Sequence, residues 1–215
     1  NGSDSGQVRV YRLSSDTNQP PEIIDGEPDP LTNDAAKAAA EAEAAEAAAE
    51  AEAAEASANE TTWSQVGSSI NGEASYDQSG ESVSLSADGS ILAIGARWND
   101  GNGNTSGHVR VYKNINDTWT QIGSDIDGEA STDQLGESVS LSADGSILAI
   151  GASQNDGNGT DSGHVRVYKN VNDTWTQIGS DIDGESAGDR SGLSISLSGD
   201  GSVLAIGAPA NDENG

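Results

Sequence analysis

The sequence contains no cysteine, methionine or phenylalanine, and only 5 of its 215 residues are proline. The absence of cysteine excludes disulfide bonds and thiolate metal sites. No apolar run approaches the ~18 residues that a membrane-spanning helix needs, so we expect no membrane insertion by this segment. The apolar side chains are mainly Val, Ile, Leu and Ala, which favours thin cores between sheets over one bulky core.

Basic residues are also scarce: 9 Lys and Arg stand against 36 Asp and Glu, a net charge of −27. Such a charge repels nucleic acids and anionic membranes, and neither is expected as a partner. It keeps the protein soluble, and it attracts divalent cations or a basic partner.

What the sequence has in abundance is repetition. Trp63, Trp119 and Trp175 are 56 positions apart, and the 17 letters of 80–96 recur unchanged at 136–152. A fixed period of this kind indicates one supersecondary unit stacked on copies of itself. A catalytic constellation is usually unique within a chain, and repetition therefore argues against an enzyme.

Each repeat contains signals for four short strands. Residues 107–114 alternate in polarity, 119–125 and 138–142 are short strand candidates, and 147–152 is a continuous apolar run expected for a strand buried on both faces. Asp144-Gly145 is typical of a two-residue hairpin turn. We expect an all-β protein of β-propeller blades, with the apolar run as the innermost strand; a β-solenoid is the alternative.

The order of these motifs resembles the FG-GAP repeat of integrin α-subunit propellers and secreted microbial proteins. The resemblance is carried by HVRVY at 108–112 and 164–168, NDGNGTDSG at 155–163, and Gly-Ala-Pro at 207–209. It implies an extracellular or cell-surface propeller that binds a protein or a glycan through surface loops.

Two departures from the family matter. Its calcium loop, Asp-x-Asp-x-Asp-Gly, is replaced by short hairpins at Asp88, Asp144 and Asp200, so that site is expected to be missing. The family closes its ring with about seven blades. Three repeats make a partial ring, and we expect the chain to be part of a larger propeller or to associate with further copies.

We divide the chain into three repeats and one insertion. The first repeat comprises 1–12 and 58–103, the second 104–159 and the third 160–215. The insertion, 13–57, holds a Pro-rich linker and an Ala/Glu-rich α-helix at about 35–58, because both residues are strong helix formers. The helix is interpreted as a spacer or as a contact arm.

Two Gly-rich loops are calcium candidates, because they place side-chain oxygens at alternate positions. Their ligand residues would be Asp100, Asn102 and Asn104 in one loop and Asp156, Asn158 and Asp161 in the other. A second candidate set is Asp125, Asp127 and Glu129 with their copies Asp181, Asp183 and Glu185. Asn and Asp before Gly are equally residues of plain turns.

The remaining candidates concern modification and catalysis. Asn-x-Ser/Thr triplets at predicted turns are glycosylation candidates if the protein is secreted; they begin at Asn59, Asn104, Asn116, Asn158 and Asn172. His108 and His164 occupy one repeat position, at which the first copy has Gln7. We interpret them as strand side chains and not as general bases.

These observations predict a non-catalytic extracellular propeller segment that acts as a binding, adhesion or structural scaffold. Its partner would be a protein, a glycan or further copies of itself, and no cofactor other than Ca²⁺ is indicated. The alternatives are an accessory propeller domain of a secreted enzyme and a purely structural filament or surface-layer protein.

Overall fold

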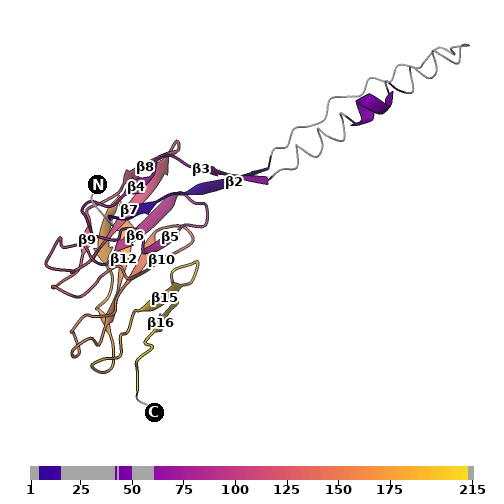
Figure 1. Cartoon of the computed structure of the whole chain (residues 1–215). Helices are drawn as coiled ribbons and strands as arrows, with labels where there is room; N and C mark the ends of the chain where they lie inside the picture. The colour runs from indigo at the N-terminus through magenta and orange to yellow at the C-terminus, as the bar shows by residue number, and fades with distance from the viewer. Residues whose placement is uncertain (1–4, 16–41, 43, 50–60, 213–215) are drawn as a thin grey trace, which may run out of the picture. The chain divides into compact units, whose positions relative to one another are not determined.

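The computed structural model describes residues 5–15, 42, 44–49 and 61–212 (Figure 1). The chain divides into two compact units, of which one comprises Asn1–Val10 with Val66–Gly215 and the other Tyr11–Gln65. The first unit is built almost wholly of antiparallel strands. The prediction of an all-β, propeller-like fold is therefore confirmed.

The smaller unit contains one antiparallel pair, β2 (Tyr11–Ser15) with β3 (Thr61–Gln65). The predicted insertion, 13–57, begins inside β2, because Leu13, Ser14 and Ser15 are paired with β3; its other residues fall between the two strands in the sequence. Residues 42 and 44–49 are α-helical with exposed side chains, within the predicted helix of 35–58. The rest of that helix and the Pro-rich linker lie outside the described residues.

The larger unit contains two complete sheets with the same strand order. The first consists of β5 (Ser82–Leu85), β6 (Ile91–Ala96), β7 (His108–Ile115), β8 (Thr118–Gln121) and β9 (Ile126–Asp127). The second consists of β10 (Ser138–Leu141), β11 (Ile147–Ala152), β12 (His164–Val171), β13 (Thr174–Gln177) and β14 (Ile182–Asp183). Both short strands β8 and β9 pair with β7, so together they fill the fourth strand position, as β13 and β14 do on β12.

Two smaller pairs flank these sheets along the chain: β1 (Gln7–Val8) with β4 (Ile70–Asn71), and β15 (Ser194–Leu197) with β16 (Leu204–Gly207). The complete sheets run from 82 to 127 and from 138 to 183, and so cross the boundaries at 103/104 and 159/160 between the predicted repeats. Each sequence repeat thus contributes strands to two successive sheets, which ties neighbouring sheets together covalently.

The core lies between sheets. Val109 and Val111, which are 0% and 1% exposed, belong to the same cluster as Leu148, Ile150 and Tyr168 of the following sheet. On the opposite face, the copies of those three residues, namely Leu92, Ile94 and Tyr112, pack with Val8 and Ile70. Each sheet therefore buries both faces, and this explains why the apolar runs 91–96 and 147–152 do not alternate in polarity.

The expectation that the ILAIGA run is the innermost strand is wrong. In each complete sheet this run is the second strand, and the edge strand is the serine-rich β5 or β10. β10 packs against β5 on one side and β15 on the other (Figure 1). The run is apolar because it is paired on both edges and covered on both faces. The edge strand contains serines because its side chains meet the next sheet.

Serine hydroxyls join these edge strands to the next sheet. Ser82 Oγ donates to the carbonyl of Gly136 at 2.6 Å, and Ser138 Oγ donates to that of Gly192 at 2.7 Å. The amide of Leu141 in turn donates to Ser84 Oγ at 2.9 Å, and the amide of Leu197 to Ser140 Oγ at 3.0 Å. Backbone groups that would remain unpaired at an edge are thus satisfied by the neighbouring sheet.

The close approach requires glycine in the ILAIGA strands. A Cβ built on Gly95 would lie 2.0 Å from the Gly136 carbonyl oxygen, and one built on Gly151 would lie 2.1 Å from that of Gly192. Both contacts are with backbone, which cannot rotate away.

Replacing Gly151 with alanine should therefore separate the second sheet from β15. We expect Gly151→Ala to lower the free energy of unfolding by about 1–3 kcal/mol, the range for overpacked positions. The matched control is Gly199→Ala, because a Cβ there makes an ordinary contact at 3.5 Å and the equivalent positions, 87 and 143, already hold Ala. Urea unfolding checks both variants, and equal stabilities would contradict this account of the sheet junction.

An Asp-Gly pair lies in each of the three hairpin turns, but the prediction of a two-residue turn is wrong. Leu141 pairs with Leu148 and the amide of Ser142 donates to the carbonyl of Ile147, so that turn comprises the four residues 143–146, and its positive φ is at Gly145.

At the first of these turns, Asp88 Oδ1 accepts the Ser86 hydroxyl at 2.7 Å, the Ser90 amide at 2.9 Å and the Ser90 hydroxyl at 2.8 Å. The Ser86 hydroxyl, followed by the backbone and side chain of Ser90, lowers the pKa of Asp88 to about 2. Equivalent hydrogen bonds from Ser142 and Ser146 lower the pKa of Asp144. Those from Ser198 and Ser202 lower the pKa of Asp200 to about 2.

Because the folded-state pKa is depressed, these bonds contribute above the unfolded pKa of about 3.9 and are lost as the pH falls towards 2. We expect Ser86→Ala to raise the pKa of Asp88, since it removes the largest cause of the depression. Carboxyl ¹³C NMR titration measures this, with Asp144 in the same chain as the unchanged control. An unaltered Asp88 titration in the variant would refute the assignment.

Candidate functional site

The two predicted calcium loops follow β6 and β11 and are closed by their own hydrogen bonds. Asp100 Oδ1 accepts the amide of Thr105 at 2.7 Å, and Asp156 Oδ1 accepts that of Asp161 at 2.9 Å. Asn102 Nδ2 donates to the carbonyl of Gly128 at 2.8 Å, and Asn158 Nδ2 to that of Gly184 at 2.9 Å. Asn104 is exposed, and its carbonyl accepts the amide of Thr132. These side chains therefore stabilise the loops by hydrogen bonds, and their oxygens keep lone pairs with which a cation could be bound.

The asparagine that opens each loop has a structural role. Asn99 Nδ2 donates to the buried carboxylate of Asp77 at 3.2 Å, and Asn155 Nδ2 to that of Asp133 at 3.0 Å. Asp133 also accepts the amide of Ala130. These pairs hold the loop after the second strand against the segment before the first strand.

Of the predicted glycosylation residues, Asn104, Asn116, Asn158 and Asn172 are exposed. Asn116 and Asn172 lie in the tight turns between β7 and β8 and between β12 and β13, with φ of 50° and 53°. Asn158 differs because its Nδ2, the atom to which a glycan would be attached, donates to two carbonyls. Asn59 lies outside the described residues.

A further group of ionisable side chains converges where two sequence repeats meet. His108 begins β7, Asp125 precedes β9, and Glu73 follows β4 in the preceding repeat. His108 Nδ1 lies 3.8 Å from Asp125 Oδ2 and 3.9 Å from Glu73 Oε2. Both distances exceed hydrogen-bond length.

The same arrangement recurs 56 residues later with Glu129, His164 and Asp181. His164 Nδ1 lies 3.8 Å from Asp181 Oδ2 and 4.0 Å from Asp183 Oδ1. We call the two groups junction site 1 (Glu73, His108, Asp125) and junction site 2 (Glu129, His164, Asp181). In each site the three side chains bring one ligand atom apiece within 4.8 Å of the others.

The second set of acids predicted from the sequence is thus divided between sites. Asp125 belongs to junction site 1 and Glu129 to junction site 2, although they are four residues apart. Among the described residues, the acids of the Gly-rich loops belong to neither group. The role of Glu73 was missed, because it meets His108 only through the stacking of successive repeats.

An arginine closes each site on one side. Arg110 Nη1 lies 3.5 Å from Glu73 Oε1, and Arg110 Nη2 donates to the carbonyl of Asn71 at 3.0 Å. Arg166 repeats both contacts, with Glu129 at 3.5 Å and the carbonyl of Asp127 at 3.0 Å. Each arginine thus pairs with an acid of the preceding repeat.

The two imidazoles are buried, and each is 1% exposed. Nε2 of both is enclosed with no hydrogen-bond partner among the described residues. Burial lowers the pKa of His108 and of His164, and Arg110 and Arg166 lower it further against the opposing effect of the acids. Both imidazoles are accordingly uncharged at neutral pH.

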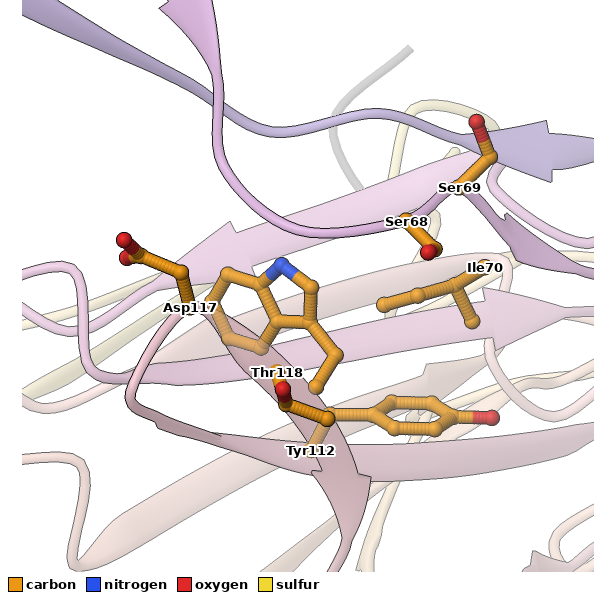
Figure 2. A pocket seen from close by; sticks show the side chains of 7 residues that line it. Ser68, Ser69, Ile70, Tyr112, Asp117 and Thr118 are labelled. Carbon is orange, nitrogen blue, oxygen red and sulfur yellow. The ribbon is translucent and has the colours of Figure 1, made fainter.

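A pocket of about 210 Å³ lies on the face of β7 that carries His108, towards the opposite end of the strand. Ile70, Tyr112 and Trp119 supply apolar surface, and Ser68, Ser69, Asp117 and Thr118 supply polar groups (Figure 2). Trp119 is held by a hydrogen bond from Nε1 to the carbonyl of Val66 at 3.0 Å. The pocket is smaller than the ~300–1,000 Å³ clefts that enclose whole small molecules.

These stacked sheets define a β-propeller-like repeat module. Residues 71–112 and 124–168 match the FG-GAP repeat family, and these segments are FG-GAP repeats, as the motifs had indicated. The two matches contain His108, Arg110, Glu129 and His164. No curated protein matches the chain.

No helix among the described residues has the length and apolar character required to cross a membrane.

Calcium binding by the Gly-rich loops remains a prediction. If they bind it, the midpoint of thermal unfolding should be higher with excess Ca²⁺ than with excess EDTA, because a ligand of the folded state stabilises it. Asp100→Asn combined with Asp156→Asn should remove the difference while keeping side chains that can close the turns. Equal midpoints for the unaltered chain in Ca²⁺ and EDTA would refute calcium binding.

Proposed function

We propose that this chain is a non-catalytic, extracellular binding module that presents a protein or glycan ligand with a rigid propeller surface. The observation that carries the proposal is the duplication of its chemistry. Among the described residues, the two groups of His, Asp and Glu side chains close enough to share a metal ion are copies at one repeat position. Duplicated positions suit a repeated scaffold, whereas a reaction needs one distinct constellation.

The pocket at Trp119 is the contact point that we propose for the ligand. Aromatic surface next to hydroxyl and carboxylate groups suits either a side chain with a polar tip or one sugar ring. Tyr112 and Trp119 also belong to the core between sheets, so the pocket wall is fixed before a ligand arrives. FG-GAP repeats support the same proposal, because modules of this type often bind proteins.

Self-association as a structural scaffold is the second candidate function, and the edge of β16 favours it. Among the described residues β16 pairs with β15 alone. Val203, just before β16, is 65% exposed, whereas Ile91 at the equivalent position is 9% exposed. A strand from a further repeat or a second copy would cover this edge.

The immobilised chain should capture a protein or glycan from an extracellular fraction, identified by mass spectrometry. Ser68→Arg should abolish capture because Ser68 is exposed at the pocket and a long cation would fill it. Ser124→Arg, at the equivalent exposed position of the next repeat, is the matched control and should retain binding.

The other outcomes separate the alternatives. Capture only of differently tagged copies of this chain would favour the structural scaffold. Chemical conversion of a captured ligand would favour an enzyme, with the propeller as its accessory domain. Equal capture by Ser68→Arg and the unaltered chain would refute the pocket as the contact point.

A further inference from the structure

The junction sites bring three acceptor atoms together. In junction site 1 a nitrogen of a buried imidazole faces two carboxylate oxygens, at 3.8 and 3.9 Å, from separate segments of the chain. Neither distance permits a direct hydrogen bond. With its proton on Nε2, His108 would direct a lone pair at two negative charges. Nε2 has no hydrogen-bond partner among the described residues in either tautomer, so the choice of tautomer alone does not satisfy this imidazole.

From this arrangement we infer that each junction site binds a divalent transition-metal ion of the zinc type, held by one imidazole and two carboxylates. A neutral imidazole nitrogen selects Zn²⁺ over the hard cations Ca²⁺ and Mg²⁺, which prefer oxygen ligands alone. A metal ion between the three atoms would satisfy all of them at once. It would also replace the repulsion between Glu73 and Asp125 with attraction.

The distances are compatible with such an ion. Ligand atoms 2.0–2.2 Å from a tetrahedral zinc ion are about 3.4 Å apart. Closing from 3.8 or 3.9 Å requires shifts of a few tenths of an ångström at the imidazole of junction site 1, and the other ligand pairs, which lie within 4.8 Å, require at most about 1.4 Å. The side chains of Glu73 and Asp125 are 46% and 31% exposed and can make this shift, while the buried imidazole stays fixed. Their exposure also leaves the fourth coordination position open to solvent.

Charge is consistent with a divalent ion. Glu73, Asp125 and Asp127 lie around His108, and Arg110 offsets one of these three negative charges. Arg110 contacts Oε1 of Glu73, whereas Oε2 faces the imidazole. The arginine therefore orients Glu73 and leaves the other oxygen for the metal.

The first repeat provides an internal comparison. At the positions of His108 and Asp125 it has Gln7 and Ser69, so two of the three ligands are replaced together. Gln7 Nε2 donates to Asn71 Oδ1 at 3.0 Å, and Gln7 Oε1 accepts Arg9 Nε at 2.9 Å. In the first repeat, which has no acid at the position of Asp125, the side-chain amide of Gln7 has hydrogen-bond partners at both its nitrogen and its oxygen. The histidines at the other two positions have no partner at Nε2 among the described residues.

Isothermal titration of the metal-free, untagged full chain with ZnCl₂ tests the inference. We expect two zinc ions per chain, one for each junction site. His108→Gln or His164→Gln should reduce this to one, and the double variant should show no saturable binding. Glutamine occupies this position in the first repeat, where it is exposed, so the circular dichroism spectrum of each variant must show that the buried position accepts it as well. CaCl₂ should give no signal that depends on either histidine.

Two further measurements keep the test decisive. If the glutamine variants lose their native circular dichroism spectrum, the double variant Asp125→Ser with Asp181→Ser takes their place. It introduces the serine that the first repeat has at this position, and it should also abolish binding. ¹⁵N NMR of the imidazoles should show Nδ1 of both histidines shifted on zinc addition. Zinc binding that survives in the double variants would reduce the effect to adsorption on surface acids and overturn the inference. Absence of saturable binding to the unaltered chain would also overturn it.

Discussion

The contact between the ILAIGA strand of one sheet and the backbone of the next fixes the spacing of the whole repeat array. Gly95 lies against the Gly136 carbonyl, and Gly151 against that of Gly192. A methyl group at either position would force the sheets apart. At this spacing serine hydroxyls reach the neighbouring backbone, and the two apolar clusters close between sheets. The apolar clusters between the sheets therefore close only because the backbones approach each other at these glycines.

The same spacing creates the junction sites. Glu73 and His108 are separated by most of a repeat, and they meet only because successive sheets stack at a fixed distance. Arg110 binds the carbonyl of Asn71 and the carboxylate of Glu73, so it joins two successive repeats beside His108. A site of this kind cannot form within one isolated repeat. Binding there would stabilise the array as a whole, since it joins residues from both sides of a junction.

Local features of the fold could be predicted from the sequence. The Asp-Gly hairpins, the HVRVY strands and the FG-GAP motifs depend on neighbouring residues, and each was placed correctly along the chain, although the turns have four residues and not the predicted two. The position of the ILAIGA strand was not, because a continuous apolar run indicates burial on both faces without indicating which strand pairs with it. The serine-rich edge strand looks polar in sequence, and its serines are used by the next sheet. The convergence of Glu73 on His108 was equally hidden, since no local pattern encodes the stacking of repeats.

Comparison of the repeats with one another separates positions that hold the scaffold from positions that vary with a site. Gly95, Gly151 and Gly207 are the same residue in all three copies, as are Asn99, Asn155 and Asn211. His108 and Asp125 instead change together, to Gln7 and Ser69. The acid of the adjacent short strand changes with them, from Asp127 to Asn71, and Asn71 accepts a hydrogen bond from Gln7. The surroundings of this strand position therefore differ between repeats, whereas the residues that stack the sheets stay the same.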